Sequence, residues 1–259
     1  MKILRISVLP SLLTLGNAIC GFLSIAYVAD GRFVNAAWMI FAAMLFDALD
    51  GKVARMTGGT SDFGMQLDSL ADVITFGVAP AFLVKVLVQS PHSPYHSKIA
   101  WGLSVLFVLC AALRLARFNV ETARHDDDSH SSFRGLPSPA AAGSVASLVI
   151  LYDFLDQRQV ILLLLPPVTV LLGALMISRF RYVHAFNKVV RGGKSFAQLA
   201  QIVFLLIFAA ILPEIAFATL FLGFSLSGPA RTIWRLLHRK AAVETEDEEA
   251  PSTEAEVGR

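Results

Sequence analysis

Long apolar stretches recur along almost the whole chain, and polar positions gather in the short segments between them. Each stretch has roughly 17–25 residues, the length that a helix needs to cross a hydrocarbon core about 30 Å thick. We expect eight such helices, at residues 8–29, 33–55, 66–89, 98–120, 136–154, 159–178, 196–212 and 214–236. The pattern therefore predicts an all-α, polytopic membrane helical bundle.

Composition and charge agree with this prediction. The 259 residues are 55% hydrophobic, and the mean hydropathy of +0.62 is well above that of an ordinary soluble domain. Of the 22 Lys and Arg residues, 17 fall in termini and loops that share one face of the predicted bundle. Cytoplasmic loops are enriched in Lys and Arg. We therefore expect a multi-pass protein of the inner (cytoplasmic) membrane, with both termini in the cytosol, the lipid bilayer as its surroundings and no nucleic-acid partner.

The C-terminal residues differ from the rest of the chain. Residues 241–259 hold seven acidic residues and few apolar ones, a composition typical of disorder. We divide the chain into a membrane core at 1–178, a basic cytosolic loop with two additional membrane helices at 179–240, and a disordered acidic tail at 241–259.

Four aspartates stand at the ends of two predicted membrane helices. Asp47 and Asp50 are three residues apart near the end of the second helix, and Asp68 and Asp72 are four apart near the start of the third. Each pair therefore shares one helix face. A carboxylate at a membrane boundary is costly unless it is paired or binds a ligand. Two antiparallel helices joined by a turn at 57–61 would bring all four together at the cytosolic end.

The neighbouring residue types suit a phosphate-containing ligand. Carboxylates without nearby His or Cys favour Mg²⁺ or Mn²⁺ over zinc. Mutual repulsion among four carboxylates favours two divalent cations, which could stabilise both oxygens of a displacement at phosphorus. Gly51, Ala54 and Gly64 would leave a helix wall bare for a bulky ligand, and Arg55 suits a phosphate.

Two other interpretations of the aspartates remain open from the residues alone. They could be helix-end residues paired with Lys52, Arg55 or Arg114. They could also form the translocation site of a cation transporter, although transporters place such carboxylates near the bilayer midplane on broken helices. The clustering of these four at one face argues against transport.

The stretch from Asp47 to Asp72 resembles the signature of the CDP-alcohol phosphotransferase family, D-x2-D-G-x2-A-R-x8-G-x3-D-x3-D, at all nine fixed positions. Members are membrane enzymes with a six-helix core that join a CDP-activated group to an alcohol and release CMP. The resemblance implies that the first six helices form this core and that the chain is a homodimer. It further implies that Asp47, Asp50 and Asp68 are metal ligands and that Asp72 is both a ligand and the general base. The implied CDP-binding positions are Gly51, Ala54, Arg55 and Gly64.

A second region bears on the acceptor alcohol. Arg114, Arg117 and Asn119 end the fourth helix, and Arg134 belongs to a bend at Phe133–Pro139. These segments resemble the phosphatidylserine synthase branch, which transfers a phosphatidyl group from CDP-diacylglycerol to L-serine. The serine carboxylate needs a cationic partner, which one of the three arginines could supply, and Asn119 could accept from the ammonium group. We expect exchange of Arg117 for Ala to raise the KM for serine more than that for the lipid.

Another acceptor within the same family is the nearest alternative. Glycerol 3-phosphate, an inositol phosphate or choline would use the same metal site, and the residues of the fourth helix and of the bend favour serine over them.

Overall fold

The computed structural model describes residues 8–57, 61–89, 93–124, 135–180, 182 and 210–248. Every regular element within these ranges is a helix. The elements are α1 (Val8–Ala29), α2 (Phe33–Thr57), α3 (Asp62–Asp72), η1 (Val73–Val78), α4 (Ala79–Val88), α5 (Ser97–Arg124), α6 (Ser138–Phe154), α7 (Gln159–Ile177) and α10 (Pro213–Glu248). The predicted all-α bundle is confirmed.

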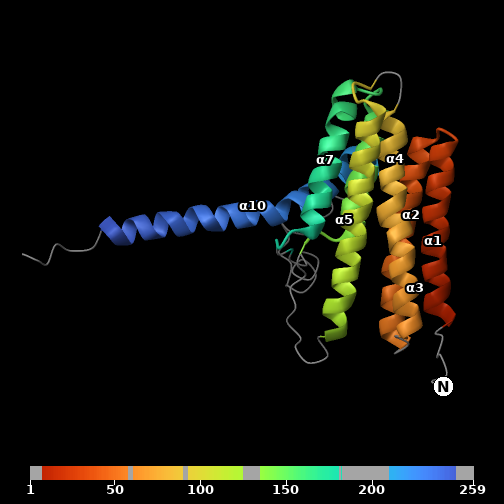
Figure 1. Cartoon of the computed structure of the whole chain (residues 1–259), viewed down its shortest axis with the longest axis horizontal. Coiled ribbons are helices and arrows are strands. Elements are labelled where there is room, and N and C mark those ends of the chain that lie inside the picture. Colours follow the sequence, from red (N-terminus) through yellow and green to blue (C-terminus); the bar gives the residue numbers. More distant parts are fainter. Residues whose placement is uncertain are drawn as a thin grey trace, which may run out of the picture.

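Helices α1 to α7 run side by side along the length of the bundle (Figure 1). Within the described part of the chain, five helices are long and apolar enough to cross a membrane: Val8–Ala29, Phe33–Met56, Phe63–Val88, Ser97–Glu121 and Gln159–Ile177. They correspond to the first four predicted membrane helices and the sixth. The third is built from α3, η1 and α4, because a single π-helical segment interrupts an otherwise continuous helix.

The remaining three predicted membrane helices have different outcomes. The fifth is α6, whose 17 residues are mostly buried by the other helices. The seventh, at 196–212, lies largely outside the described residues. The eighth falls within α10, whose 36 residues give a length of about 54 Å, more than a bilayer core requires. The count of eight and the domain boundaries stay predictions.

The C-terminal helix extends further than the sequence predicts. α10 continues to Glu248, although we predicted disorder from residue 241. Alanine and glutamate, which are good helix formers, occupy much of the segment 241–248. Low hydrophobicity alone was therefore a poor guide to backbone structure in this segment.

The first half of α10 packs against α6 and α2. Gly143 of α6 leaves room for Phe221, since a Cβ on this glycine would lie only 2.4 Å from the ring. The hydroxyls of Ser144 and Ser225 are 2.9 Å apart, and Phe217 stacks on Phe41 of α2 with ring centroids 4.9 Å apart. Beyond this contact, α10 runs across the direction of the other helices (Figure 1).

Helix α1 sets the spacing of the helices that carry the aspartates. It packs along α2 and also against α3 and η1. Gly21 permits the close approach to η1, because a Cβ there would lie 3.0 Å from the Cα of Thr75. The Thr75 hydroxyl donates a 3.2 Å hydrogen bond to the carbonyl of Asn17. α1 therefore contacts both acidic helices and ties them to one another.

Candidate active site

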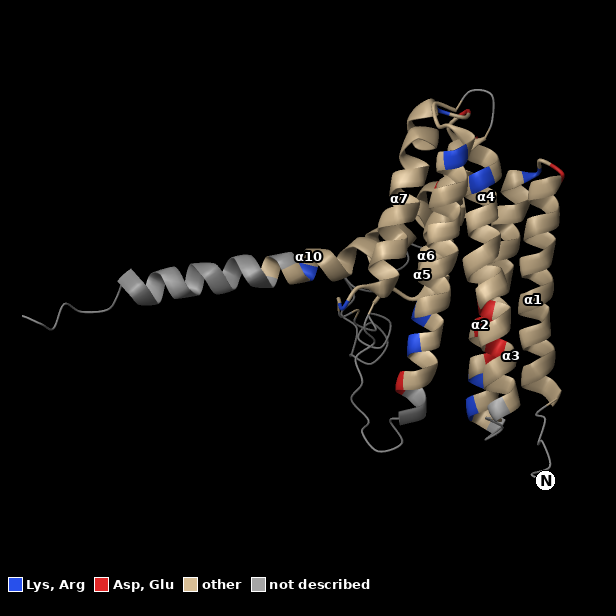
Figure 2. Cartoon of the chain, viewed as in Figure 1, with Lys and Arg blue, Asp and Glu red and all other residues tan. Residues whose placement is uncertain are grey.

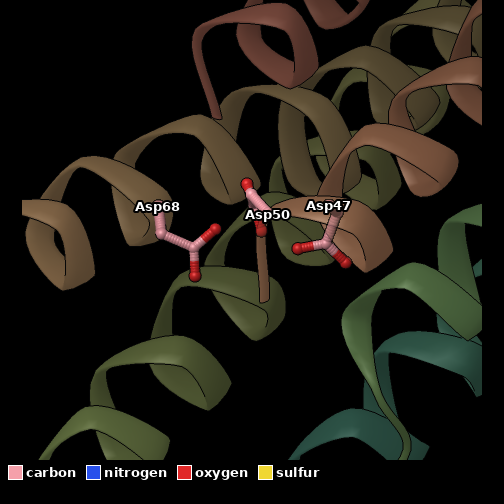
Figure 3. Close-up of side chains that lie close together, drawn as sticks. All are labelled: Asp47, Asp50 and Asp68. Carbon is pink, nitrogen blue, oxygen red and sulfur yellow. The ribbon is translucent and has the colours of Figure 1, made fainter. Parts of the chain in front are cut away.

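Three of the four aspartates converge. Asp47 and Asp50 come from α2 and Asp68 comes from α3, and one carboxylate oxygen of each lies within 4.8 Å of those of the other two. Their side chains point toward one another (Figure 3). The acidic positions of α2 and α3 lie toward the end of the bundle where α1 begins and α2 ends (Figure 2). Two helices thus bring residues 21 positions apart in the sequence into one group.

A capped helix start places Asp68 and Asp72 on α3. The backbone of Ser61 is extended, and its hydroxyl accepts a 3.0 Å hydrogen bond from the N–H of Gly64. A serine in this position satisfies one of the free N–H groups of the first turn. The cap fixes the start of the helix that carries the two aspartates.

Among the described residues, no Lys or Arg forms a salt bridge with the converging carboxylates. Asp50 is 5% exposed, and one oxygen of Asp68 is buried without a hydrogen-bond partner. Among the described residues the ion pair present joins Arg117 to Glu121, and none involves the four aspartates. The interpretation as simple ion pairs with Lys52, Arg55 or Arg114 is therefore not supported. Clustered, partly buried carboxylates with an unpartnered oxygen fit a hard divalent cation.

Asp72 has a different environment from the other three. It is 7% exposed, and its Oδ1 accepts a 3.2 Å hydrogen bond from Nδ2 of Asn17. The guanidinium of Arg114 lies near enough to Asp72 and Asp47 for their charges to interact. The π-helical segment η1 begins immediately after Asp72, and such segments are frequent at functional sites.

Two residues of this region were missed by the sequence analysis. Thr14 and Asn17 both lie on α1, and Thr14 Oγ1 donates a 2.9 Å hydrogen bond to Oδ2 of Asp50. A detectable signal was present: two polar residues three positions apart share one face of a mostly apolar helix.

The residues predicted to bind CDP lie next to the aspartates in the sequence, and they differ in how exposed they are to solvent. A Cβ added to Gly51 would meet no atom within 4 Å, so this side of α2 is open. Arg55 is exposed and Ala54 is half-buried. Gly64 lies in the first turn of α3, where a Cβ would be 3.1 Å from the Ser61 hydroxyl. The open face beside Asp50 leaves space for a ligand.

The residues predicted to bind the acceptor alcohol make contacts with different partners. Arg114 donates a 2.9 Å hydrogen bond to the hydroxyl of Ser138 at the start of α6. Asn119 donates a 2.7 Å bond to the hydroxyl of Ser69, which lies between two of the aspartates in sequence. Arg117 instead donates a 3.2 Å bond to the carbonyl of Ile177, at the end of α7. Arg134 lies outside the described residues.

The bend before α6 is tied to the same end of α7. Gly135 has a φ of +88°, and a Cβ there would lie 2.4 Å from the carbonyl oxygen of Met176. The Gly135 N–H donates to the carbonyl of Phe180, and the Leu136 N–H donates to that of Leu175. Glycine is therefore required for this turn, which sets the position of Ser138 beside Arg114.

Comparison with known proteins identifies the family. Residues 7–171 match the family described as CDP-alcohol phosphatidyltransferase. The chain belongs to this family. The match spans the segment that contains all four aspartates, and it confirms the family resemblance and the prediction that the chain is an enzyme.

Similar proteins come from bacteria and archaea. A CDP-diacylglycerol–serine O-phosphatidyltransferase of Helicobacter pylori is 42% identical over 192 residues, which are 73% of this chain and 77% of that protein. A protein of the same name from Methanocaldococcus jannaschii is 36% identical over 73% of this chain and 80% of its own. The archaetidylserine synthase of Methanothermobacter thermautotrophicus is 43% identical over 58% of this chain and 60% of its own. These relatives confirm the resemblance to the serine branch.

Proposed function

We propose that the protein transfers the phosphatidyl group of CDP-diacylglycerol to L-serine, giving phosphatidylserine and CMP. The observation that carries this proposal is the convergence of Asp47, Asp50 and Asp68, with Asp72 one helical turn beyond, at an open face of α2. The same reaction is named for relatives that are 36–42% identical over 73% of the chain.

We assign the three converging carboxylates to divalent cations, Mg²⁺ or Mn²⁺. Their oxygen ligands suit these hard cations, and the buried, unpartnered oxygen of Asp68 has the character of an unfilled ligand position. When bound, two such cations would neutralise the pyrophosphate and the charge that develops on the departing CMP. A contribution of Asp72 to the second cation stays a prediction.

The remaining chemistry belongs to side chains of the protein. Asp72 accepts the proton of the serine hydroxyl as that oxygen forms a bond to the phosphorus carrying diacylglycerol. The bond between this phosphorus and the bridging oxygen of the pyrophosphate breaks, and CMP leaves with the electron pair. A single in-line displacement of this kind inverts the configuration at phosphorus, whereas a covalent enzyme intermediate would retain it.

Arg114 is the arginine best placed to receive the serine carboxylate. Its charge interacts with Asp72, and its hydrogen bond to Ser138 holds the guanidinium between α5 and α6. Arginine recognises carboxylates through two parallel donors. Asn119, bonded to Ser69 on α3, lies near enough to the motif to bind the ammonium group. Arg55 and the bare surface at Gly51 are assigned to the cytidine diphosphate.

The location of the site relative to the membrane determines how the two substrates reach it. The five spanning helices make this a membrane protein, and the distribution of Lys and Arg supports a site that opens to the cytosol from the inner membrane. The acyl chains of CDP-diacylglycerol would remain in the bilayer while its headgroup enters beside α2. The homodimer implied by the family resemblance stays a prediction.

The test is release of CMP from CDP-diacylglycerol by purified protein. We expect release that requires L-serine and either Mg²⁺ or Mn²⁺ and that stops when the cation is chelated. Asp72→Asn should lower kcat by about 10²–10⁴-fold, because it removes the general base. Release with glycerol 3-phosphate, an inositol phosphate or choline but not with serine would discard the acceptor assignment. Ion flux in liposomes without CMP release would favour a transporter.

A further inference from the structure

Asn119 and Ser69 form a side-chain hydrogen bond between α5 and α3. Nδ2 of Asn119 donates to Oγ of Ser69 over 2.7 Å. Both residues are half-buried, so neither side chain is enclosed by protein. Ser69 lies three residues before Asp72 and therefore shares its face of α3. The bond thus holds the Asn119 amide beside the helix face that carries the proposed general base.

A second hydrogen bond of Ser69 decides which way the amide is turned. The Ser69 hydroxyl donates its single proton to the carbonyl of Met65, one turn earlier on α3, over 3.0 Å. With that proton engaged, Ser69 can offer Asn119 only a lone pair, and the amide must present its NH₂ group rather than its oxygen. Because both amide atoms are bonded to the same carbon, fixing Nδ2 also fixes the direction of Oδ1.

The amide oxygen is the end of Asn119 that is left for a ligand. Among the described residues, the hydrogen bond of the Asn119 side chain goes to Ser69, and none reaches Oδ1. An amide oxygen accepts hydrogen bonds, whereas an ammonium group has donors and no acceptor. An ammonium group can therefore bind this oxygen, and it would meet only another donor if the amide were reversed.

Arg114 binds α5 to the same face of α3 at a neighbouring level. It precedes Asn119 by five residues on α5, and its charge interacts with that of Asp72. Arg114 is thus opposite Asp72, and Asn119 is opposite Ser69, in the reversed order expected of antiparallel helices. An amino-acid acceptor with its carboxylate on Arg114 and its hydroxyl at Asp72 can then direct its ammonium group to Asn119.

We propose that Ser69 is a positioning residue that determines the acceptor preference of the site. Its hydroxyl turns Oδ1 of Asn119 toward the ammonium group of an amino-acid acceptor, and an alcohol without that group gains nothing from the arrangement. The inference rests on the proposed function, because it concerns the acceptor of the same reaction.

The test measures CMP release by the full-length protein in detergent. Ser69→Ala should raise the KM for serine about tenfold, because the amide is then free to turn and its bond to the ammonium group is weakened. Ser69→Thr keeps a hydroxyl and should stay within about threefold of the wild type. The KM for CDP-diacylglycerol should also stay within about threefold in both variants. The same is expected of Mn²⁺ binding, measured from the electron paramagnetic resonance signal of the free ion.

Two comparisons separate this role from a general loss of packing. In a chain that already carries Asn119→Ala, the change Ser69→Ala should raise the serine KM less than about twofold further, because Ser69 acts through an amide that is absent. The second comparison uses 3-hydroxypropionate, which has the hydroxyl and the carboxylate of serine but no ammonium group. Its inhibition constant against serine should change less than about threefold in Ser69→Ala.

Ser144→Ala is the matched control. The Ser144 hydroxyl also donates to the carbonyl one turn earlier, that of Ala140, over 2.8 Å, and it lies 2.9 Å from the hydroxyl of Ser225 on another helix. The variant therefore loses the same kinds of contact between α6 and α10, and its serine KM should stay within about threefold of the wild type. A rise as large as in Ser69→Ala would show a general effect of a lost interhelical hydroxyl and would overturn the proposal.

Three other results would also overturn it: an unchanged serine KM in Ser69→Ala, fully additive effects of Ser69→Ala and Asn119→Ala, or a rise in the inhibition constant of 3-hydroxypropionate equal to the rise in the serine KM. Failure of the proposed function gives a different pattern, since the wild type itself would then release no CMP with serine.

Discussion

The two arginines of α5 should have different effects when each is replaced by methionine. The sequence alone made Arg117 the residue to test for serine binding, because it did not distinguish two arginines near the same end of one predicted helix. The structure favours Arg114, whose charge interacts with those of Asp72 and Asp47. Arg117 instead binds the carbonyl of Ile177 and pairs with Glu121 at 3.4 Å. Methionine retains an apolar stem and removes the charge in both cases.

The expected magnitude follows from the bond that each arginine would lose. A hydrogen bond to a charged partner contributes about 1.5–3 kcal/mol, so Arg114→Met should raise the KM for serine by about ten- to 150-fold. The KM for CDP-diacylglycerol should change less than about threefold, because the lipid is bound elsewhere. Arg117→Met should change the serine KM less than about threefold and lower stability by about 0.5–1.5 kcal/mol through loss of the bond to α7.

The assay measures the rate of CMP release. The serine concentration is varied at saturating CDP-diacylglycerol, and the CDP-diacylglycerol concentration is then varied at saturating serine. Apparent melting temperatures of both variants are measured in the same detergent. An equal rise in the KM for serine and in the KM for CDP-diacylglycerol in Arg114→Met would show that this arginine does not bind serine specifically. A larger rise in the serine KM from Arg117→Met than from Arg114→Met would refute the reasoning from the contacts and restore Arg117 to the acceptor site.

Two further predictions concern the packing of the helices. Gly21→Ala should destabilise the protein by about 1–3 kcal/mol, because its Cβ would lie 2.4 Å from the hydroxyl of Thr75; Gly102→Ala, where no atom lies within 4 Å, is the control in thermal unfolding. Burial raises the pKa of Tyr182 from its ordinary value near 10 to about 12, so the neutral phenol that donates to Ser225 is favoured by folding. Its contribution to stability is present below pH 10 and is lost as the pH rises through about 12. Melting temperatures between these pH values should fall less in Tyr182→Phe than in the wild type, and an equal fall would contradict this role.

Hydropathy and spacing were sufficient for much of the architecture. Apolar stretches long enough to cross a bilayer determined the helical class and the five spanning helices, because a chain in lipid must satisfy its backbone hydrogen bonds internally. The i,i+3 and i,i+4 spacings of the aspartates determined which of them share a helix face. Hydropathy was a weaker guide for α10, where charged and good helix-forming residues continue a helix past the apolar stretch.

Only the tertiary structure decided how the four aspartates differ. In the sequence they are two similar pairs, whereas in space three converge and Asp72 is held by Asn17 from a helix 55 positions earlier. The two arginines of α5 are likewise equivalent in sequence and face different partners in the bundle. Spacing along one helix determines which side chains share a face. Which neighbour that face meets depends on contacts such as that of Gly21 with Thr75, which packing between distant segments alone establishes.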